Sequence, residues 1–553
     1  MSRVRGKWFV LVALLLAFAV IGAACASQDE PGGVIDEDEG DVQMGGTIVV
    51  GAEQEPTEGL NTSLACCSLA WGTWIQNQIF EGAYVNMPDF SYAPNLIEGE
   101  AELTEDPFTL TYHIKEEAAW NDGTPISADD FAFTQEVYVN PKNKMASRAG
   151  YDKITETEII DEKTVKFTFS EPYAGWKDLF NPVWPKHVLE GQNFNKIFSK
   201  AFLTADGEPI ASGPWLFSDY KPGESLTLVK NENFWGEHPP YADEIVFRFL
   251  PETNTEIQAL RGGEVDLIYP QPQLELVPLT TNPDFAIQTN AGTTWEHVDI
   301  QLGDKGNPAM KIPEVRQALA YAIDREALVG NLFKDLSPDL GVLNNTIYMA
   351  NAPEYVPNWE TYTFDPAKAE ELLSSAGCKK GNDGVQVCDG ERLSLDFTST
   401  AGNALRELAF EVIQEQVKAV GFELNADFGD AGVVFGPKGL VGFNFDLFMF
   451  AWVGSADPAG SVEIWKCEGS QNYTTYCNDE VTELLEQSDT FLDPTARAEA
   501  MNEADRLMSE DVPTIPLYQK PTFLASSIKV HGIEDNPTQE GFFWNSENWW
   551  IEQ

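Results

Sequence analysis

Alternating apolar and polar positions predict a series of β-strands along the chain. The clearest run is Phe108–Ile114, in which apolar side chains occupy every second position. This is the period of a strand with one buried face. Shorter runs of the same kind predict three further strands, at Val165–Phe169, Leu226–Leu228 and Ile245–Phe249.

Helices are predicted between the strands from the signals at their ends. A helix begins at Asp365-Pro366, an N-cap followed by Pro at the first helical position, and ends before Gly377. The same signals predict three more helices: one opening at Asp493-Pro494 and running towards Val512, one opening at Pro313, and one over Ala404–Val420 ended by Gly421. Strands and helices interleave throughout, which indicates an α/β or α+β fold.

The first 25 residues indicate export. Basic residues precede an apolar run of 14 residues, Trp8–Ile21, which is followed by Gly22-Ala23-Ala24-Cys25. This order is typical of a secretory signal, and the run is short for a membrane span of about 20 residues. An uncleaved N-terminal anchor is the alternative. Small residues directly before a Cys resemble a bacterial lipoprotein signal, which implies lipidation of Cys25 after removal of residues 1–24. Residues 25–46 are then an acidic tether.

The composition of the chain limits which kinds of partner it can bind. The chain has 553 residues, 15 Trp, 33 Phe and a net charge of −53. So many aromatic residues exclude a disordered chain, and so acidic a surface excludes nucleic acid and disfavours an anionic membrane surface. The acidity has two interpretations: a surface that favours solubility, or recognition of a cationic ligand. The carboxylates are spread along the chain, which favours the first.

The cysteine count also fits an exported protein. Without Cys25 six cysteines remain, and an even number in this setting predicts disulfides. Local pairs are expected for Cys378 with Cys388 and for Cys467 with Cys477. Cys66-Cys67 is left as a vicinal disulfide or as two thiols. No metal site is predicted, because the spacing is not C-x-x-C and the five His are scattered.

One segment is more specific than the rest. Trp120–Phe131 combines a strand end, an Asp-Gly turn and a helix start, with Ser127 as N-cap and Asp130 three residues on. It resembles the W-x-D-G-x-P-x-x-A-x-D-V signature of bacterial extracellular solute-binding proteins of family 5, the oligopeptide/dipeptide/nickel-type binding subunits of ABC importers, with Phe131 in place of Val. Further segments resemble the family in the same order: Ile79–Gly82, Ser212–Trp215, Asn231–Gly236, Gly263–Asp266, Val315–Arg325, Lys368–Gly377 and Thr514–Tyr518.

The resemblance implies a type II periplasmic-binding-protein-like clamshell of two lobes with an extra inserted domain. Domain I would comprise residues 47–84, 205–290 and 525–553, domain II the insertion 85–204, and domain III residues 291–524. A monomer would trap a small-molecule or oligopeptide ligand between domains I and III. It would deliver the ligand to ABC permease and ATPase subunits, from the outer face of the cytoplasmic membrane or the periplasm. Its only membrane contact would be the lipid anchor, and no cofactor is implied.

The resemblance also places the ligand-binding residues. On the domain III side they are Trp452, Gly454, Ser455 and Asp457, with Trp295 and Glu296 as further candidates; on the domain I side they are Ser68, Ala70 and Trp71. Peptide binders of the family place a carboxylate shortly after the Trp, for the α-ammonium of the ligand. Ser455 occupies that position, and a shift of the alignment would bring Asp457 there instead.

Because Ser455 is neutral and an unpaired buried charge is costly, three ligand classes stay open. A peptide comes first; an oligosaccharide stacked on Trp side chains or a nickel chelate are the alternatives. An exported hydrolase is the enzyme alternative. The chain contains no G-x-S-x-G, H-E-x-x-H or P-loop motif, so no enzyme activity is predicted.

Overall fold

The computed structural model describes residues 42–337, 340–454 and 456–553. The chain divides into two compact units, Met1–Val42 and Gln43–Gln553, and the second is described below. The predicted signal peptide, Cys25, most of the tether and Ser455 lie outside the described residues. In the part of the chain that is described, no helix has the length and apolar character needed to cross a membrane.

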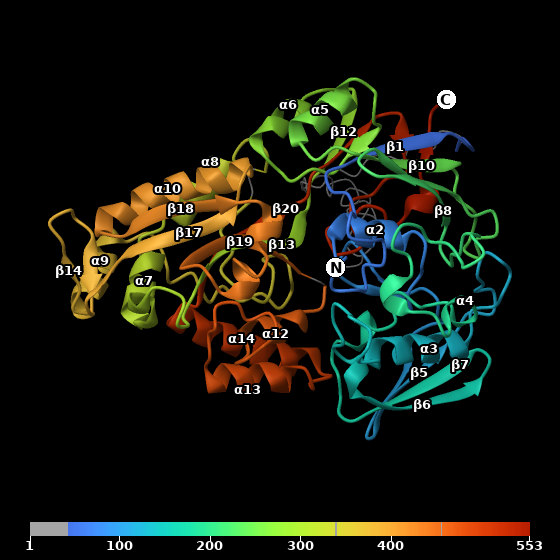
Figure 1. The fold of residues 1–553 in the computed structure, drawn as a ribbon, viewed down its shortest axis with the longest axis horizontal. Helices are drawn as coiled ribbons and strands as arrows, with labels where there is room; N and C mark the ends of the chain where they lie inside the picture. Colours follow the sequence, from blue (N-terminus) through green and yellow to red (C-terminus); the bar gives the residue numbers. More distant parts are fainter. Residues whose placement is uncertain (1–41, 338–339, 455) are drawn as a thin grey trace, which may run out of the picture. The chain divides into compact units, whose positions relative to one another are not determined.

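A seven-stranded sheet takes its strands from both ends of the unit (Figure 1). The N-terminal strand β1 (Thr47–Ala52) lies in its interior, parallel to both of its neighbours. The complete order is β12 (Phe285–Gln288), β21 (Leu524–Ser527), β11 (Leu267–Ile268), β1, β10 (Glu244–Phe249), β9 (Ser225–Lys230) and β8 (Trp215–Lys221). Since β21 pairs with both β11 and β12, the C-terminal part of the chain completes this sheet.

A four-stranded antiparallel sheet is built from residues between β1 and β8. Its order is β4 (Glu102–Glu105), β5 (Phe108–His113), β7 (Thr164–Phe169) and β6 (Ile154–Asp161). Helix α3 (Ala128–Val139) packs on β6 and β7. The predicted turn before α3 is confirmed: Gly123 has φ +88°, and Asp130 accepts a hydrogen bond from the Ser127 N–H at 2.9 Å. Only Gly adopts such a positive φ without strain, so the Asp-Gly pair fixes the turn.

A five-stranded mixed sheet holds the rest of the chain. Its order is β18 (Glu423–Gly429), β17 (Ser394–Thr400), β19 (Leu447–Val453), β13 (Ala291–Ile300) and β20 (Thr514–Pro521). The predicted helices surround it: α7 (Pro313–Tyr321), α9 (Pro366–Ser375), α10 (Ala404–Val420) and α14 (Pro494–Asp511). Gly421 ends α10 in the left-handed conformation, as its position predicts.

The remaining elements are short. The helices are α2 (Ala70–Asn77), α4 (Lys186–Leu189), α5 (Thr253–Arg261), α6 (Val277–Thr280), α8 (Arg325–Phe333), α11 (Ala431–Val434), α12 (Gly460–Trp465) and α13 (Asp479–Ser488). The strands are β2 (Tyr84–Asn86), β3 (Tyr92–Pro94), β14 (Lys379–Lys380), β15 (Gln386–Cys388), β16 (Glu391–Arg392), β22 (Val530–His531) and β23 (Trp550–Ile551).

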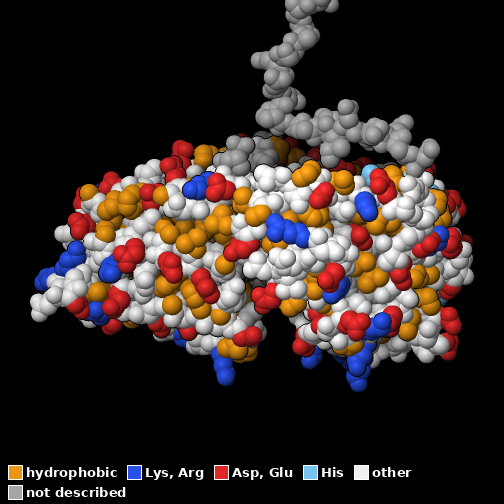
Figure 2. Space-filling view, turned by 90° about the horizontal axis from the view of Figure 1, so that it is seen from above, with side chains coloured by type: hydrophobic (Ala, Val, Ile, Leu, Met, Phe, Trp, Pro, Cys, Tyr) orange, Lys and Arg blue, Asp and Glu red, His pale blue; other side chains and the backbone are white. Residues whose placement is uncertain are grey.

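Two large hydrophobic clusters support the sheets. One lies around the five-stranded sheet and its helices and continues to α5 and α6 beside the seven-stranded sheet, and the other lies beneath the seven- and four-stranded sheets. Each is rich in fully buried aromatic side chains, such as Trp465 in the first and Trp120 in the second. Figure 2 shows Asp and Glu side chains scattered over the visible face among neutral and hydrophobic ones. On this face the acidity of the chain is a general surface property.

Candidate ligand-binding site

The predicted Trp452 lies at the end of β19, in a stack of rings. It is half-buried, and it lies parallel to Tyr473, with ring centroids 6.0 Å apart and an angle of 8° between the planes. It also lies parallel to the ring of the buried His297, with ring centroids 6.3 Å apart. Trp295 pairs with Trp452 across the β13–β19 ladder and is itself 4% exposed. Trp452 can therefore present part of its ring at the end of β19, whereas Trp295 is mostly packed away.

Glu296, also predicted, is the centre of a buried charge cluster. Its side chain is 2% exposed and accepts from the Arg406 guanidinium, with Nη2 2.8 Å from Oε1. Lys520 Nζ lies 3.7 Å from the same oxygen. Burial alone would raise the pKa of Glu296, but Arg406 and Lys520 outweigh it and hold that pKa below its usual value. Glu296 is therefore ionised and paired within the chain.

The cluster extends to the end of β1 in the seven-stranded sheet. Lys520 donates to Gln271 Oε1 at 2.9 Å, and the Gln271 N–H lies 3.4 Å from Glu53 Oε2. Glu53 follows β1 directly. Burial raises the pKa of Glu53, and the charge of Lys520 opposes this rise. A line of alternating charges thus runs from the end of β1 through β20 to β13, joining the two sheets.

Three members of this line, Glu53, Arg406 and Lys520, were missed by sequence reasoning. Each stands at a strand end or in the first turn of a helix, and that position is the only signal they carry. In a chain with 88 acidic and 35 basic residues, single charges at such positions are not distinctive. Distances in three dimensions are needed to find them.

Trp71, predicted as a ligand-binding residue, is buried, and its neighbour Trp74 is the more exposed of the two. Trp71 is 1% exposed and packs edge-on against Trp74, at 5.2 Å, and against Phe542, at 6.0 Å. Trp74, one turn along α2, is half-buried and donates its indole N–H to the Gln539 carbonyl at 3.0 Å. Ser68 is exposed and Ala70 is half-buried. Trp74 therefore offers more surface at this edge than Trp71.

The loop before α2 carries the Cys66–Cys67 pair, whose Sγ atoms lie 2.20 Å apart. The Ala65 N–H donates to the Lys144 carbonyl at 2.9 Å, and the Ala146 N–H donates to the Ser63 carbonyl at 2.8 Å. The other two cysteine pairs have the predicted partners, with Sγ–Sγ distances of 1.99 Å for Cys378–Cys388 and 2.02 Å for Cys467–Cys477.

Asp457 forms an ion pair with Arg497 of α14. The two guanidinium nitrogens donate to its carboxylate at 2.5 and 2.7 Å, and both side chains are largely buried. The Ala459 N–H donates to the same carboxylate at 2.8 Å. Gly454 precedes this loop, and a Cβ there would lie 2.8 Å from the Thr293 carbonyl oxygen, so the position admits only Gly without movement. The roles of Gly454 and Asp457 in ligand binding stay predictions.

A cavity of about 1100 Å³ opens beside these residues. Its lining comes from two stretches of the chain, residues from Tyr138 to Asn181 and residues from Ala459 to Thr490, together with Gln539. Tyr473, the stacking partner of Trp452, lines it. The volume is sufficient for a ligand of several hundred daltons.

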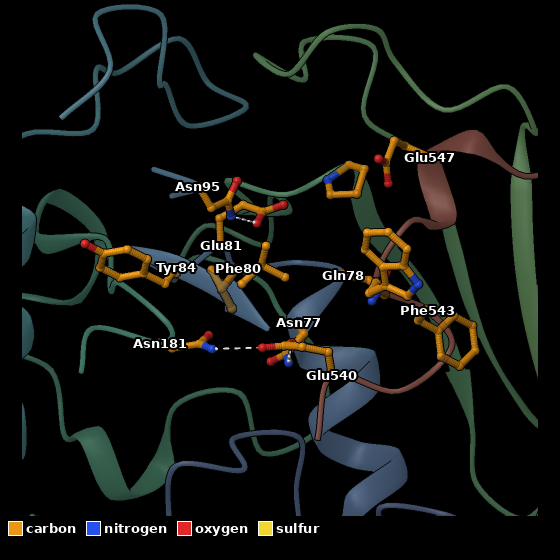
Figure 3. Close-up of a pocket in the computed structure, with 14 residues that line it drawn as sticks. Asn77, Gln78, Phe80, Glu81, Tyr84, Asn95, Asn181, Glu540, Phe543 and Glu547 are labelled. Carbon is orange, nitrogen blue, oxygen red and sulfur yellow. Dashed lines mark hydrogen bonds between the residues drawn. The ribbon is translucent and has the colours of Figure 1, made fainter. Parts of the chain in front are cut away.

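A second cavity, of about 50 Å³, lies near α2 and the C-terminal segment (Figure 3). Figure 3 shows Glu540 between Asn77 and Asn181, and Glu81 beside Asn95. Asn77 donates to Glu540 at 3.0 Å and Asn181 donates at 3.4 Å. Burial raises the pKa of Glu81 to about 8. These carboxylates already have amide donors, and the cavity is far smaller than the usual ligand pocket.

Comparison with known proteins assigns the chain to a family. Residues 91–473 match the description "Bacterial extracellular solute-binding proteins, family 5 Middle". The chain belongs to this family. It is therefore a solute-binding protein and not an enzyme, and the family-5 resemblance predicted from its motifs is confirmed.

Individual relatives cover nearly the whole chain. The oligopeptide-binding protein AppA of Bacillus subtilis (strain 168) is 24% identical over 561 residues, covering 99% of each chain. Among solved structures, the periplasmic EDTA-binding protein EppA has a TM-score of 0.87 at 25% identity, covering 95% of this chain and 100% of its own. NikZ of Campylobacter jejuni, in complex with Ni(L-His), has a TM-score of 0.80 at 24% identity, covering 91% and 99%. The predicted two-lobed family-5 fold with mixed helices and sheets is confirmed.

Proposed function

We propose that this family-5 protein is the exported binding subunit of an ABC importer and traps a peptide-like ligand between the seven-stranded and five-stranded sheets. The observation that carries the proposal is the charge line from Glu53 through Lys520 to Glu296, which joins the end of β1 in one sheet to β20 and β13 in the other. Its charges are balanced within the protein, so it can form the floor of a ligand site without a ligand present.

The peptide ligand is supported by the relatives. AppA of Bacillus subtilis, similar over almost the full length, is an oligopeptide-binding protein. The half-buried Trp452 and Trp74 provide apolar surface beside the floor. Export, lipidation of Cys25, the three disulfides and delivery to permease and ATPase subunits complete the proposal. The domain boundaries predicted from the sequence, 47–84, 85–204, 205–290, 291–524 and 525–553, are part of it.

A metal chelate is the second candidate. The similarity to EppA, which is named for EDTA binding, favours it. An oligosaccharide remains the third class, since Trp452 could stack on an apolar sugar face.

Thermal melting of the full purified chain separates these classes. We expect tri- to pentapeptides to raise the melting temperature, because a ligand at one hundred times its dissociation constant stabilises the fold by about 2.7 kcal/mol. Metal–EDTA complexes and oligosaccharides are tested in parallel at matched ionic strength. If one of these raises the melting temperature and peptides do not, that class and not a peptide is the ligand. No shift with any class would refute the proposed ligand set.

A further inference from the structure

Within the described residues, the chain crosses between the seven-stranded and the five-stranded sheet at two places. One crossing, residues 289–290, joins β12 to β13, and the other, residues 522–523, joins β20 to β21. The two crossings are hydrogen-bonded to each other. The Thr522 N–H donates to the Asn290 carbonyl at 2.8 Å, and the Asn290 N–H donates to the Thr522 hydroxyl at 2.9 Å. A movement of one sheet against the other must therefore turn about this pair of crossings.

A buried carboxylate binds both crossings. Asp535 is 2% exposed, and its Oδ2 accepts a hydrogen bond from the Asn290 side-chain amide at 2.7 Å and another from the Thr522 hydroxyl. The Asp535 N–H donates to the side chain of Gln288, the last residue of β12, at 2.8 Å. One residue of the C-terminal segment therefore contacts the end of β12 and both crossings at once.

The residues on either side of Asp535 bind a strand of each sheet. The Ile533 carbonyl accepts from the Gln288 side-chain amide at 2.9 Å, in the seven-stranded sheet. The Pro537 carbonyl accepts from the Thr293 N–H at 3.1 Å, in β13 of the five-stranded sheet. Residues 533–537 thus bracket the place where the chain passes from one sheet to the other.

The chemistry of a buried carboxylate explains why this contact resists separation of the crossings. Burial raises the pKa of Asp535, and the hydrogen bonds from Thr522 and Asn290 oppose this rise. If the crossings moved apart, the carboxylate would lose these donors in a place that water does not reach, which is costly. A rotation that keeps both donors on the carboxylate has no such cost.

We propose that Asp535 is a positioning residue for ligand capture, whose carboxylate fixes the spacing of the two crossings so that they act as one hinge. The inference rests on the proposed function, in which a ligand is trapped between the two sheets, and deepens it. In the described state the inserted segment already touches the five-stranded part, because the Ala174 N–H donates to the Asp489 carbonyl at 2.7 Å. Without the Asp535 carboxylate, the two parts would separate more often.

Hydrogen–deuterium exchange of the full chain tests this role in the absence of ligand. Asp535→Leu removes the acceptor with little change in size. We expect the backbone amides of Asn290 and Thr522 to exchange about tenfold faster in this variant, because a buried hydrogen bond contributes roughly that factor. Asp535→Asn keeps an oxygen for both donors and should stay close to the wild type. Thr522→Val removes one donor at nearly constant size and should act as Asp535→Leu does, so the test does not depend on one variant folding.

Asp505→Leu is the matched control. Asp505 is also buried, and it accepts from the Thr346 hydroxyl at 2.6 Å and from the Asn358 side-chain amide at 2.9 Å, all within the five-stranded part of the chain. Its loss should lower the melting temperature and leave exchange at the crossings unchanged.

Small-angle X-ray scattering adds a measurement that a general loss of stability does not change. For the unliganded chain, with a radius of gyration of about 24 Å, we expect Asp535→Leu to raise this radius by about 1 Å and Asp505→Leu to leave it unchanged. Scattering of the wild type with an equimolar mixture of random pentapeptides tests the proposed function separately. If the mixture leaves the radius unchanged, peptide capture is contradicted, and the exchange experiment still decides the role of Asp535.

Three results would overturn the inference. The first is wild-type exchange at the crossings in Asp535→Leu and Thr522→Val. The second is an equal acceleration in Asp505→Leu, which would show that any buried carboxylate has the same effect. The third is an acceleration in Asp535→Asn as large as in Asp535→Leu, since a shared acceptor oxygen would then not be the cause.

Discussion

At the scale of single residues, the buried Glu296–Arg406 pair shows how strongly one charge depends on another. Glu296 lies in β13, between β19 and β20 of the five-stranded sheet, and Arg406 lies in the first turn of α10. Both are largely removed from water. Removing one partner of such a pair leaves a buried charge, and this usually costs more than the pair itself contributes.

Arg406→Met is therefore expected to destabilise the protein by about 3–5 kcal/mol at neutral pH. Urea unfolding followed by Trp fluorescence measures the change. The matched control is Arg506→Met on α14, whose pairs with Glu503 and Glu510 are solvent-exposed and are expected to contribute less than about 1 kcal/mol. Equal losses in the two variants would contradict the importance of burial here.

Glu81 makes stability depend on pH in the opposite sense from an ordinary carboxylate. The pKa of Glu81 in the folded state, about 8, lies above the ordinary 4.5. The contribution of Glu81 to the free energy of unfolding is therefore complete below pH 4.5 and is lost as the pH rises through 8. Glu81→Gln keeps the side chain neutral at every pH. We expect the variant to lose less stability than the wild type between pH 5 and pH 8.5.

Urea unfolding at the two pH values measures this difference. Glu58→Gln, at an exposed position, provides the control and should follow the wild type. If Glu81→Gln had the same dependence on pH as the wild type, the raised pKa of Glu81 would be refuted.

At the scale of elements, the sequence predicts local structure well and long-range structure poorly. The strand at 108–114, the turn at Gly123 and the end of α10 at Gly421 depend on a few consecutive residues, and each is confirmed. The position of β21 between β11 and β12 is not a local property. Only the family resemblance pointed to a C-terminal segment returning to the first sheet.

The same distinction applies to the site. Trp452 and Glu296 are found through the family motif, because the segments around them are continuous in sequence. Glu53 and Lys520 come from segments far apart along the chain and carry no motif of their own. Their link through Gln271 follows from how two separately formed elements pack, and no pattern in either segment encodes it.

The pair Cys378–Cys388 closes a short loop beside α9, which contains β14 and ends in β15. Replacing both with Ala is expected to cost about 3 kcal/mol, because the open chain gains loop entropy when unfolded. Urea unfolding measures the loss. When 5 mM dithiothreitol is present at denaturing concentrations of urea, the urea midpoint of the wild type should fall to that of the variant measured under the same conditions. Titration of free thiols in the untreated protein should find none among residues 43–553.

At the scale of the whole molecule, the net charge of −53 acts against compactness. Like charges repel across a surface on which carboxylates are scattered, and salt screens this repulsion over about 10 Å at 0.1 M. We expect the melting temperature to rise when NaCl is increased from 0.05 to 1 M. Choline chloride should have nearly the same effect if screening is the cause. A response to sodium alone would instead indicate specific ion binding.

The position of β21 also determines the order in which the molecule can assemble. Among the described residues, strand β12 pairs only with β21, so the pairing of β12 must wait until Leu524 is available. At about 5–20 residues per second, β1 precedes that strand by roughly half a minute or more of synthesis. For that time the nascent chain exposes an incomplete sheet edge, which invites pairing with other chains. A chain of this design benefits from crossing a membrane before it folds, so that its two ends first meet on the far side.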